Sequence, residues 1–140
     1  MAGTVLRILE REDYDFSQLV ASASSPEIPI AIDVDVSQAR EATLLVRVHS
    51  LSIASGGVTG RFTIVARASA PTDEDPSQFF RDSTAATIDI VQSVTPPALI
   101  RFPLPSNLGG WVTILVKATQ NSTGALSLKG TLSIDLSLKD

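Results

Sequence analysis

The sequence predicts an all-β protein, an antiparallel β-sandwich of the jelly-roll kind with an N-terminal arm. Three observations lead to this fold class. Apolar residues recur at every second position along most of the chain, which is the period of a half-buried strand. Clusters of glycine, proline, asparagine and serine separate these runs. After residue 25, no segment shows the 3.6-residue period of a helix.

The first clear strand is expected at residues 28–36. One face is predicted to carry the apolar residues Ile28, Ile30, Ile32, Val34 and Val36. The opposite face then carries Pro29, Asp33 and Asp35. Proline has no backbone N–H to donate, so this strand is expected to begin at Pro29 or to lie at a sheet edge.

Two further strands are expected at residues 43–52 and 61–69, with a glycine-rich turn between them. Their inward residues are predicted to be Leu44, Val46, Val48, Phe62, Ile64, Ala66 and Ala68. Their outward residues include Arg47, His49, Arg61, Thr63 and Arg67. A polar interruption follows at 70–82, and we expect Phe79 and Phe80 to pin it back onto the sheet.

The second half of the chain predicts strands at 86–94, 98–102, 111–119 and 125–138. Inward residues of these strands are expected to be Ile88, Ile90, Ala98, Ile100, Phe102, Val112, Ile114, Val116, Ala118, Leu126, Leu128, Leu132, Ile134, Leu136 and Leu138. Gly130 falls on the apolar face of the last strand, which indicates a bulge or a close backbone contact. The total is about six or seven strands.

The first 25 residues differ from the rest. Residues 5–9 fit a strand or a short helix, and 21–26 (Ala-Ser-Ala-Ser-Ser-Pro) has the composition of a linker. We therefore expect an arm at 1–25 that docks on its own domain or on a neighbour, and a sandwich domain at 26–140.

Composition excludes several function classes. The chain of 140 residues has 11 basic and 15 acidic residues and a net charge of −4, which disfavours a nucleic-acid partner. It has no cysteine and one histidine, so thiolate and multi-histidine metal sites are excluded. No apolar run reaches the roughly 20 residues of a membrane helix. We expect no cofactor, no bound metal and no membrane partner.

Candidate chemical groups are few. His49 on an outer face has no Gly-x-Ser-x-Gly nucleophile motif to serve, so it is expected to be a surface histidine rather than a catalytic base. The acidic run 73–75 is either a solvated loop tip or a calcium site. The strand carboxylates are expected to lie on solvated faces: Asp33, Asp35, Asp89 and Asp135. Trp111 points outward, either as a loop anchor or as an interface residue.

Several stretches of the chain occur in a recognisable order. Ile32-Asp33-Val34-Asp35-Val36-Ser37 precedes a Leu/Val-rich strand at 41–50, a loop at 68–73 and Phe79. Gly110-Trp111-Val112-Thr113-Ile114 and an alternating strand at 132–139 close the series. Over about residues 30–140 this series resembles small β-sandwich proteins encoded among the structural genes of tailed phages. The Asp-Glu-Asp-Pro loop and the Pro96-Pro97 break depart from that pattern.

The resemblance implies a non-enzymatic virion component of the capsid decoration (cement) or neck-associated type, with no catalytic residues. The expected partner is the major capsid protein or another virion protein, and a homo-oligomer is expected on a symmetric shell. The expected location is the virion, assembled in the host cytoplasm. Expected interface residues are Leu6, Ile8, Tyr14, Phe16, Phe79, Phe80 and Trp111. The alternatives are a carbohydrate- or ligand-binding module and, further off, a hydrolase that uses His49.

Overall fold

A computed structural model describes residues 3–17, 23–53, 60–69, 85–91, 93–120 and 127–140. Nine strands lie within these ranges: β1 (Gly3–Asp15), β2 (Ala23–Ser24), β3 (Ile28–Asp35), β4 (Glu41–Ile53), β5 (Gly60–Ala68), β6 (Ala85–Val91), β7 (Ala98–Pro103), β8 (Trp111–Gln120) and β9 (Leu128–Lys139). A short 3-10 turn at Ser106–Leu108 precedes β8. Within these ranges, no helix has the length and apolar character needed to cross a membrane.

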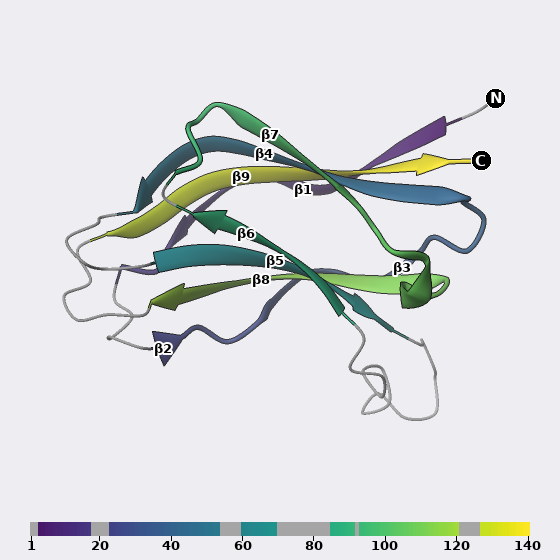
Figure 1. The fold of residues 1–140 in the computed structure, drawn as a ribbon, viewed down its shortest axis with the longest axis horizontal. Helices are drawn as coiled ribbons and strands as arrows, with labels where there is room; N and C mark the ends of the chain where they lie inside the picture. The colour runs from purple at the N-terminus through teal and green to yellow at the C-terminus, as the bar shows by residue number, and fades with distance from the viewer. Residues whose placement is uncertain (1–2, 18–22, 54–59, 70–84, 92, 121–126) are drawn as a thin grey trace.

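The strands form two stacked antiparallel sheets (Figure 1). Sheet A has the order β1-β9-β4-β7, and sheet B has the order β3-β8-β5-β6. The short strand β2 precedes β3 along the same edge of β8. Apart from the β5–β6 pair, the chain moves to the other sheet between successive long strands. This alternation is the jelly-roll arrangement, so the predicted fold class is confirmed.

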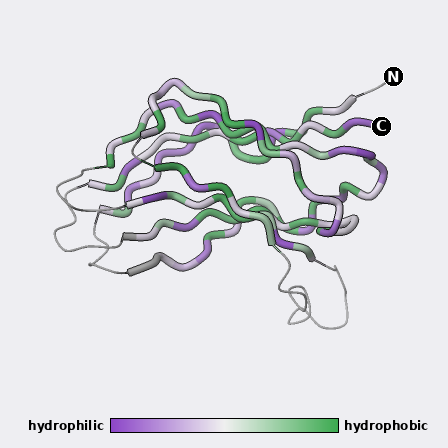
Figure 2. The backbone as a smooth tube through the Cα atoms, in the orientation of Figure 1, coloured by the Kyte–Doolittle hydropathy of each residue, from purple (hydrophilic) through white to green (hydrophobic). Residues whose placement is uncertain are grey.

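The two sheets enclose one apolar core. Apolar and polar residues alternate along strands of both sheets (Figure 2). The apolar set of these strands is buried between the sheets. The largest side chains that are fully buried include Phe62 of β5, Ile114 of β8 and Leu132 of β9. Burial of each such side chain contributes about 1.5–3 kcal/mol. The inward faces predicted for the strands at 43–52, 61–69, 86–94 and 111–119 are confirmed for the described residues.

Strand β3 departs from the predicted single apolar face. Its pairing with β8 contains two register shifts, and Ile28 and Ile32 are exposed to 38% and 57%. Asp33 adopts a left-handed backbone with φ of 54°, and its N–H donates to Oγ1 of Thr113 at 3.1 Å. The predicted faces are therefore wrong for Ile32 and Asp33, because each bulge moves the following residues to the opposite face. The position of Pro29 in an edge strand is confirmed.

Residues 3–15 form one strand of 13 residues. With it, the described residues hold eight strands besides the two-residue β2, where six or seven were predicted. Strand β1 pairs with β9 from Gly3 opposite Lys139 to Asp15 opposite Lys129, with two register shifts. The segment expected to dock on its own domain or on a neighbour therefore lies along its own sheet A. Strand β9 is described from Leu128, and the predicted start of this strand at Ala125 lies outside the described residues.

Gly130 allows two parts of the core to approach closely. It is buried on β9, where a Cβ atom would lie 3.2 Å from the Phe62 ring and 3.4 Å from Cδ1 of Leu51. The predicted close contact at this glycine is confirmed, with the Phe62 ring as the group that approaches it.

Candidate functional site

Four of the expected interface residues come from the N-terminal segment. Leu6, Ile8, Tyr14 and Phe16 are half-buried and pack against the sandwich core. The rings of Tyr14 and Phe16 are stacked 6.1 Å apart, and the Phe16 ring meets Phe62 edge-on at 5.8 Å. These residues hold the segment on its own sandwich. Their contact with a partner protein stays a prediction.

The other expected interface residues lie elsewhere. Trp111 begins β8 and is 36% exposed, in agreement with its predicted outward direction. Its backbone carbonyl accepts the N–H of Ser69 at 3.1 Å, so it lies where β5 ends. Exposed Ile32 lies on the neighbouring strand β3. Phe79 and Phe80 lie outside the described residues.

His49 lies at a bulge of β4, on the outer side of sheet A. Its Nε2 lies 2.9 Å from Oγ of Ser133 on β9. Ser133 is only 3% exposed, and the other ring nitrogen of His49 has no hydrogen-bond partner among the described residues. A catalytic serine needs an accessible hydroxyl and a base that a third group orients. The pair instead links β4 to β9 and favours a structural role.

Three more polar contacts join β9 to its neighbours on the same outer face. Thr131 donates to Oδ1 of Asp13 at 2.6 Å and accepts from the Ser50 hydroxyl at 2.9 Å. Arg7 forms an ion pair with Asp135 at 2.5 Å. Three outward side chains of β9, those of Thr131, Ser133 and Asp135, are therefore bound by β1 and β4. Their role is to join the three strands.

Between β1, β4 and β9 lies a shallow cleft of about 420 Å³. Its lining includes Asp13, Tyr14, Asp15 and Lys129. Burial, and secondarily the charge of Glu12, raises the pKa of the Tyr14 hydroxyl, so Tyr14 is a neutral donor near neutral pH. Hydrogen bonds from Ser17 lower the pKa of Asp15.

The strand carboxylates do not converge. Asp33 and Asp35 lie on β3 and Asp89 on β6, at opposite edges of sheet B, while Asp135 lies on β9 in sheet A. The Oδ1 atom of Asp33 is buried and has no hydrogen-bond partner within the described part of the chain, so the prediction of a solvated position is wrong for this residue. Its bulge turns it toward β8. The same prediction is wrong for Asp135, which is 8% exposed because β1 covers that side of β9 and Arg7 pairs with its carboxylate.

No group of three or more potential metal ligands occurs among the residues that the structure describes. The acidic run 73–75 lies outside them, so the choice there between calcium and solvent stays open.

A cleft of about 580 Å³ lies at the end of the sandwich where β3 ends and β8 begins. It lies between the β3–β4 turn and residues 103–110, with Arg40, Glu41 and Ser106 among its polar lining. Its turn is fixed by Asp35, whose Oδ1 accepts from the N–H and the hydroxyl of Ser37 at 2.9 and 2.6 Å. These two bonds lower the pKa of Asp35.

Sequence reasoning missed an apolar contact on the outer face of sheet B. Val65 of β5 lies opposite Leu115 of β8, and these residues are 2% and 4% exposed. An ion pair of 2.6 Å between Arg67 and Glu27 spans β8 beside them. The signal was present, because each apolar residue interrupts the polar positions of its strand.

No protein-family model matches the chain, and no curated protein matches it. Similar solved structures include the infectious bursal disease virus VP2 subviral particle, with 11% identity, a TM-score of 0.49 and coverage of 97% of this chain and 32% of that chain. Another is desmodium yellow mottle tymovirus, with 13% identity, a TM-score of 0.34 and coverage of 99% and 82%. The chain spans about a third of the VP2 structures it resembles.

Proposed function

We propose that this chain is a non-enzymatic structural protein of a virion, a capsid decoration protein that binds the assembled shell and stabilises it. The observation that supports the proposal is its complete jelly roll, with sheets β1-β9-β4-β7 and β3-β8-β5-β6. Viral capsid domains, lectins and cupins share this architecture. The fold alone leaves the function open, so the choice among these rests on the interior and the surfaces.

The interior supports a structural role. It is filled by apolar side chains such as Leu44, Phe62 and Ile134, all 0% exposed. Barrels that carry ligands inside need an internal cavity. In this chain the packed side chains between the sheets make the sandwich rigid. We therefore assign binding to the ends and the outer faces of the sandwich.

The expected contacts with the shell lie in the arm (1–25) and in the loops 70–82 and 95–110. Trp111 directly follows the last of these loops and exposes an aromatic ring, which is a residue type that anchors protein interfaces. A protein that binds only the assembled shell shifts the assembly equilibrium toward that state. Copies placed on a symmetric shell form a homo-oligomer. The sequence resemblance supports a tailed phage as the source of that shell, and its major capsid protein as the partner.

The test is density-gradient sedimentation of the native protein from its source. Migration with megadalton particles, and release only under denaturing conditions, is the expected result. Recovery of the protein only near the mass of a monomer or small oligomer would overturn the proposal.

A variant pair then locates the contact. Trp111→Ala is expected to reduce attachment to the particle by about tenfold or more, as for a central aromatic interface residue. Val91→Ala is the matched control, since Val91 is similarly exposed at 38% on β6, the opposite edge strand of sheet B from β3. Equal attachment of both variants would contradict the role given to Trp111.

The 580 Å³ cleft favours a second candidate, a carbohydrate- or ligand-binding module. Its volume falls within the range of about 300–1,000 Å³ typical of small-molecule sites. Ser37, Arg40 and Glu41 offer donors and acceptors suited to sugar hydroxyls. Glycan binding that Arg40→Ala abolishes would favour this function over the virion role. Dependence of that binding on calcium, Asp73 and Asp75 would assign the acidic loop as well.

A further inference from the structure

The outer face of β4 and β7 carries a patch of basic and apolar side chains. Leu45 and Arg47 alternate with core residues of β4, and Leu99 and Arg101 alternate with half-buried residues of β7. The register places Arg47 opposite Leu99 and Leu45 opposite Arg101. These four residues, termed the β4–β7 patch, therefore form a two-by-two checkerboard on one surface.

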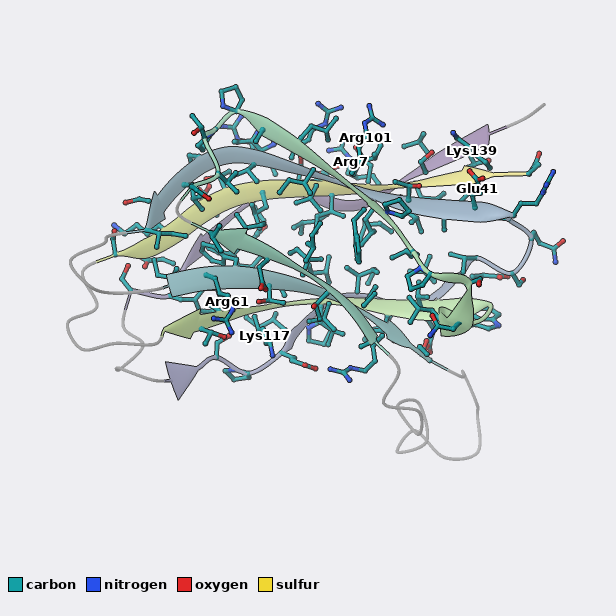
Figure 3. All side chains as sticks on the ribbon, in the orientation of Figure 1. Arg7, Glu41, Arg61, Arg101, Lys117 and Lys139 are labelled. Carbon is teal, nitrogen blue, oxygen red and sulfur yellow. The ribbon has the colours of Figure 1, made fainter. Side chains whose placement is uncertain are left out.

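The patch is open to solvent, and its charges have no partner among the residues that the structure describes. Arg47 and Arg101 are exposed, Leu99 is 40% exposed, and neither arginine forms an ion pair within the described ranges. Asp135, which lies opposite Leu45 on β9, is already paired with Arg7. Figure 3 shows Arg101 on the outer side of sheet A, away from sheet B. The patch therefore keeps about two positive charges beside exposed apolar surface.

A shallow hollow of about 240 Å³ adjoins the patch. Its lining includes Arg47, His49, Pro97 and Leu99. A hollow of this size holds one or two side chains of a partner, and an aromatic ring suits it because rings stack on arginine and pack on leucine. The preferred ligand is therefore an acidic segment that carries aromatic residues.

The chain itself contains such a segment. Residues 70–84 hold four of its acidic residues, Asp73, Glu74, Asp75 and Asp82, against the single basic residue Arg81. They also hold Phe79 and Phe80. The segment joins β5 to β6, which belong to sheet B, whereas the patch lies on the outer face of sheet A. A neighbouring copy is therefore the natural donor.

We propose that the β4–β7 patch binds the acidic segment 70–84 of a second copy of this chain. The inference rests on the contact role that the proposed function gives to loop 70–82, and it names one partner of that loop. Such a contact joins different surfaces of two copies. Made reciprocally by two copies it closes a dimer, and made in one direction it leads to a ring or a row of subunits. Pairing of the patch with a second copy of the same patch is disfavoured, because it brings the positive charges of the arginines together.

Sedimentation velocity of the purified chain tests the proposal without any particle. Wild-type protein is expected to associate as its concentration rises, and less so in high salt, because salt screens exposed charges. Arg47→Glu with Arg101→Glu is expected to weaken association by about tenfold or more. Asp73→Lys with Asp75→Lys is expected to do the same.

Mixing the two reversed variants supplies the decisive result. Each variant presents one surface that complements the other, so association is expected to return in the mixture. The control is Arg61→Glu with Lys117→Glu, which removes two basic charges from sheet B (Figure 3) and is expected to leave association unchanged. Circular dichroism checks that each variant folds. If the glutamate pair does not fold, Arg47→Gln with Arg101→Gln replaces it.

Three results would overturn the proposal: a wild-type chain that stays monomeric at every concentration, association that survives reversal of the patch, and a variant mixture that fails to associate. None of these results decides the outcome of the density-gradient experiment with the particle. Attachment to a shell by a chain that does not self-associate would leave the proposed function standing and remove only this contact.

Discussion

Nε of Arg7 lies 2.5 Å from Oδ1 of Asp135. This ion pair joins β1 to its neighbour β9, the first and the last strands of sheet A in chain order. The two partners differ in solvent contact, since the side chain of Asp135 is 11% exposed and that of Arg7 is 53% exposed. A nearly buried carboxylate needs a partner, whereas a half-exposed guanidinium does not. The pair therefore matters chiefly because it compensates the burial of Asp135.

Removal of Arg7 is expected to lower the free energy of unfolding. We expect Arg7→Met to cost about 1 kcal/mol, since it leaves the Asp135 carboxylate without its partner and solvent screens part of the loss. Urea denaturation measures the change. Arg101→Met is the control, because Arg101 is exposed on the same face without an ion pair among the described residues, and it is expected to change stability by less than about 0.5 kcal/mol. Equal effects of the two variants would refute the role of the pair.

Gly130 is expected to resist any larger side chain. A Cβ atom there would lie 3.2 Å from the ring of Phe62, which is fully buried and is held by Phe16. Gly130→Ala is expected to destabilise the protein by about 1–2 kcal/mol, and Gly130→Val by more. Thermal denaturation measures both. Gly3→Ala, whose Cβ would lie 3.5 Å from the Leu138 carbonyl, is expected to be nearly neutral. A neutral Gly130→Ala would show that the ring can move.

The hydroxyl of Ser37 is expected to control the ionisation of Asp35. The Ser37 hydroxyl and N–H bind the ionised carboxylate and lower its pKa. Stability from this group is therefore complete above the ordinary carboxyl pKa of about 3.9 and is lost as the pH falls through the lower, folded-state pKa. Ser37→Ala is expected to raise the pKa of Asp35 toward its ordinary value, as followed by NMR titration.

The control for that titration is Ser106→Ala. Ser106 lines the same cleft, and its hydroxyl makes no hydrogen bond to Asp35. It is expected to leave the pKa of Asp35 unchanged. An unchanged value in Ser37→Ala would mean that the backbone N–H alone determines the ionisation.

The division into an arm at 1–25 and a sandwich at 26–140 predicts a folded truncated chain. Deletion of residues 2–25 removes edge strand β1 but keeps β9, β4 and β7 paired. It also removes the half-buried Leu6, Ile8 and Phe16, so we expect the melting temperature to fall by about 10 °C or more. Circular dichroism against temperature measures this. Loss of the β-sheet signal would show that β1 belongs to the folding unit.

The same truncated chain is expected to lose attachment to the particle. Attachment is measured by gradient co-sedimentation at a temperature where the truncated chain is folded. Retained attachment would contradict the role proposed for the arm.

The fold was predictable where one strand face meets the core and the other meets solvent or polar neighbours. Strand β9 alternates from Leu132 to Leu136 without interruption, and the structure buries its apolar set. Strand β3 was predicted at the right place and has equally regular spacing, yet its predicted faces are wrong at Ile32 and Asp33, because Asp33 turns left-handed and binds Thr113 of β8. A bulge of this kind depends on the partner strand, so a single strand's sequence does not reveal it.

The candidate site residues were likewise predictable in regular strands and not at bulges. Trp111 could be assigned to the outside because its strand is regular. The contact of His49 with Ser133 joins residues 84 positions apart and requires the register of two strands and a bulge. The sequence of β1 has no clean alternation because two register shifts reset its faces. Its apolar residues were therefore open to assignment either to the core or to a partner.

The pairing of β1 with β9 has a consequence for synthesis of the chain on the ribosome. Gly3 lies opposite Lys139, so the strand that emerges first pairs with the strand that emerges last among those described. Translation at roughly 5–20 residues per second leaves β1 without its partner for several seconds or more. During that time β4 also lacks β9, its neighbour in the centre of sheet A. Sheet A therefore closes only after translation of β9, and nascent chains crowded on one messenger expose unpaired strands to one another until then.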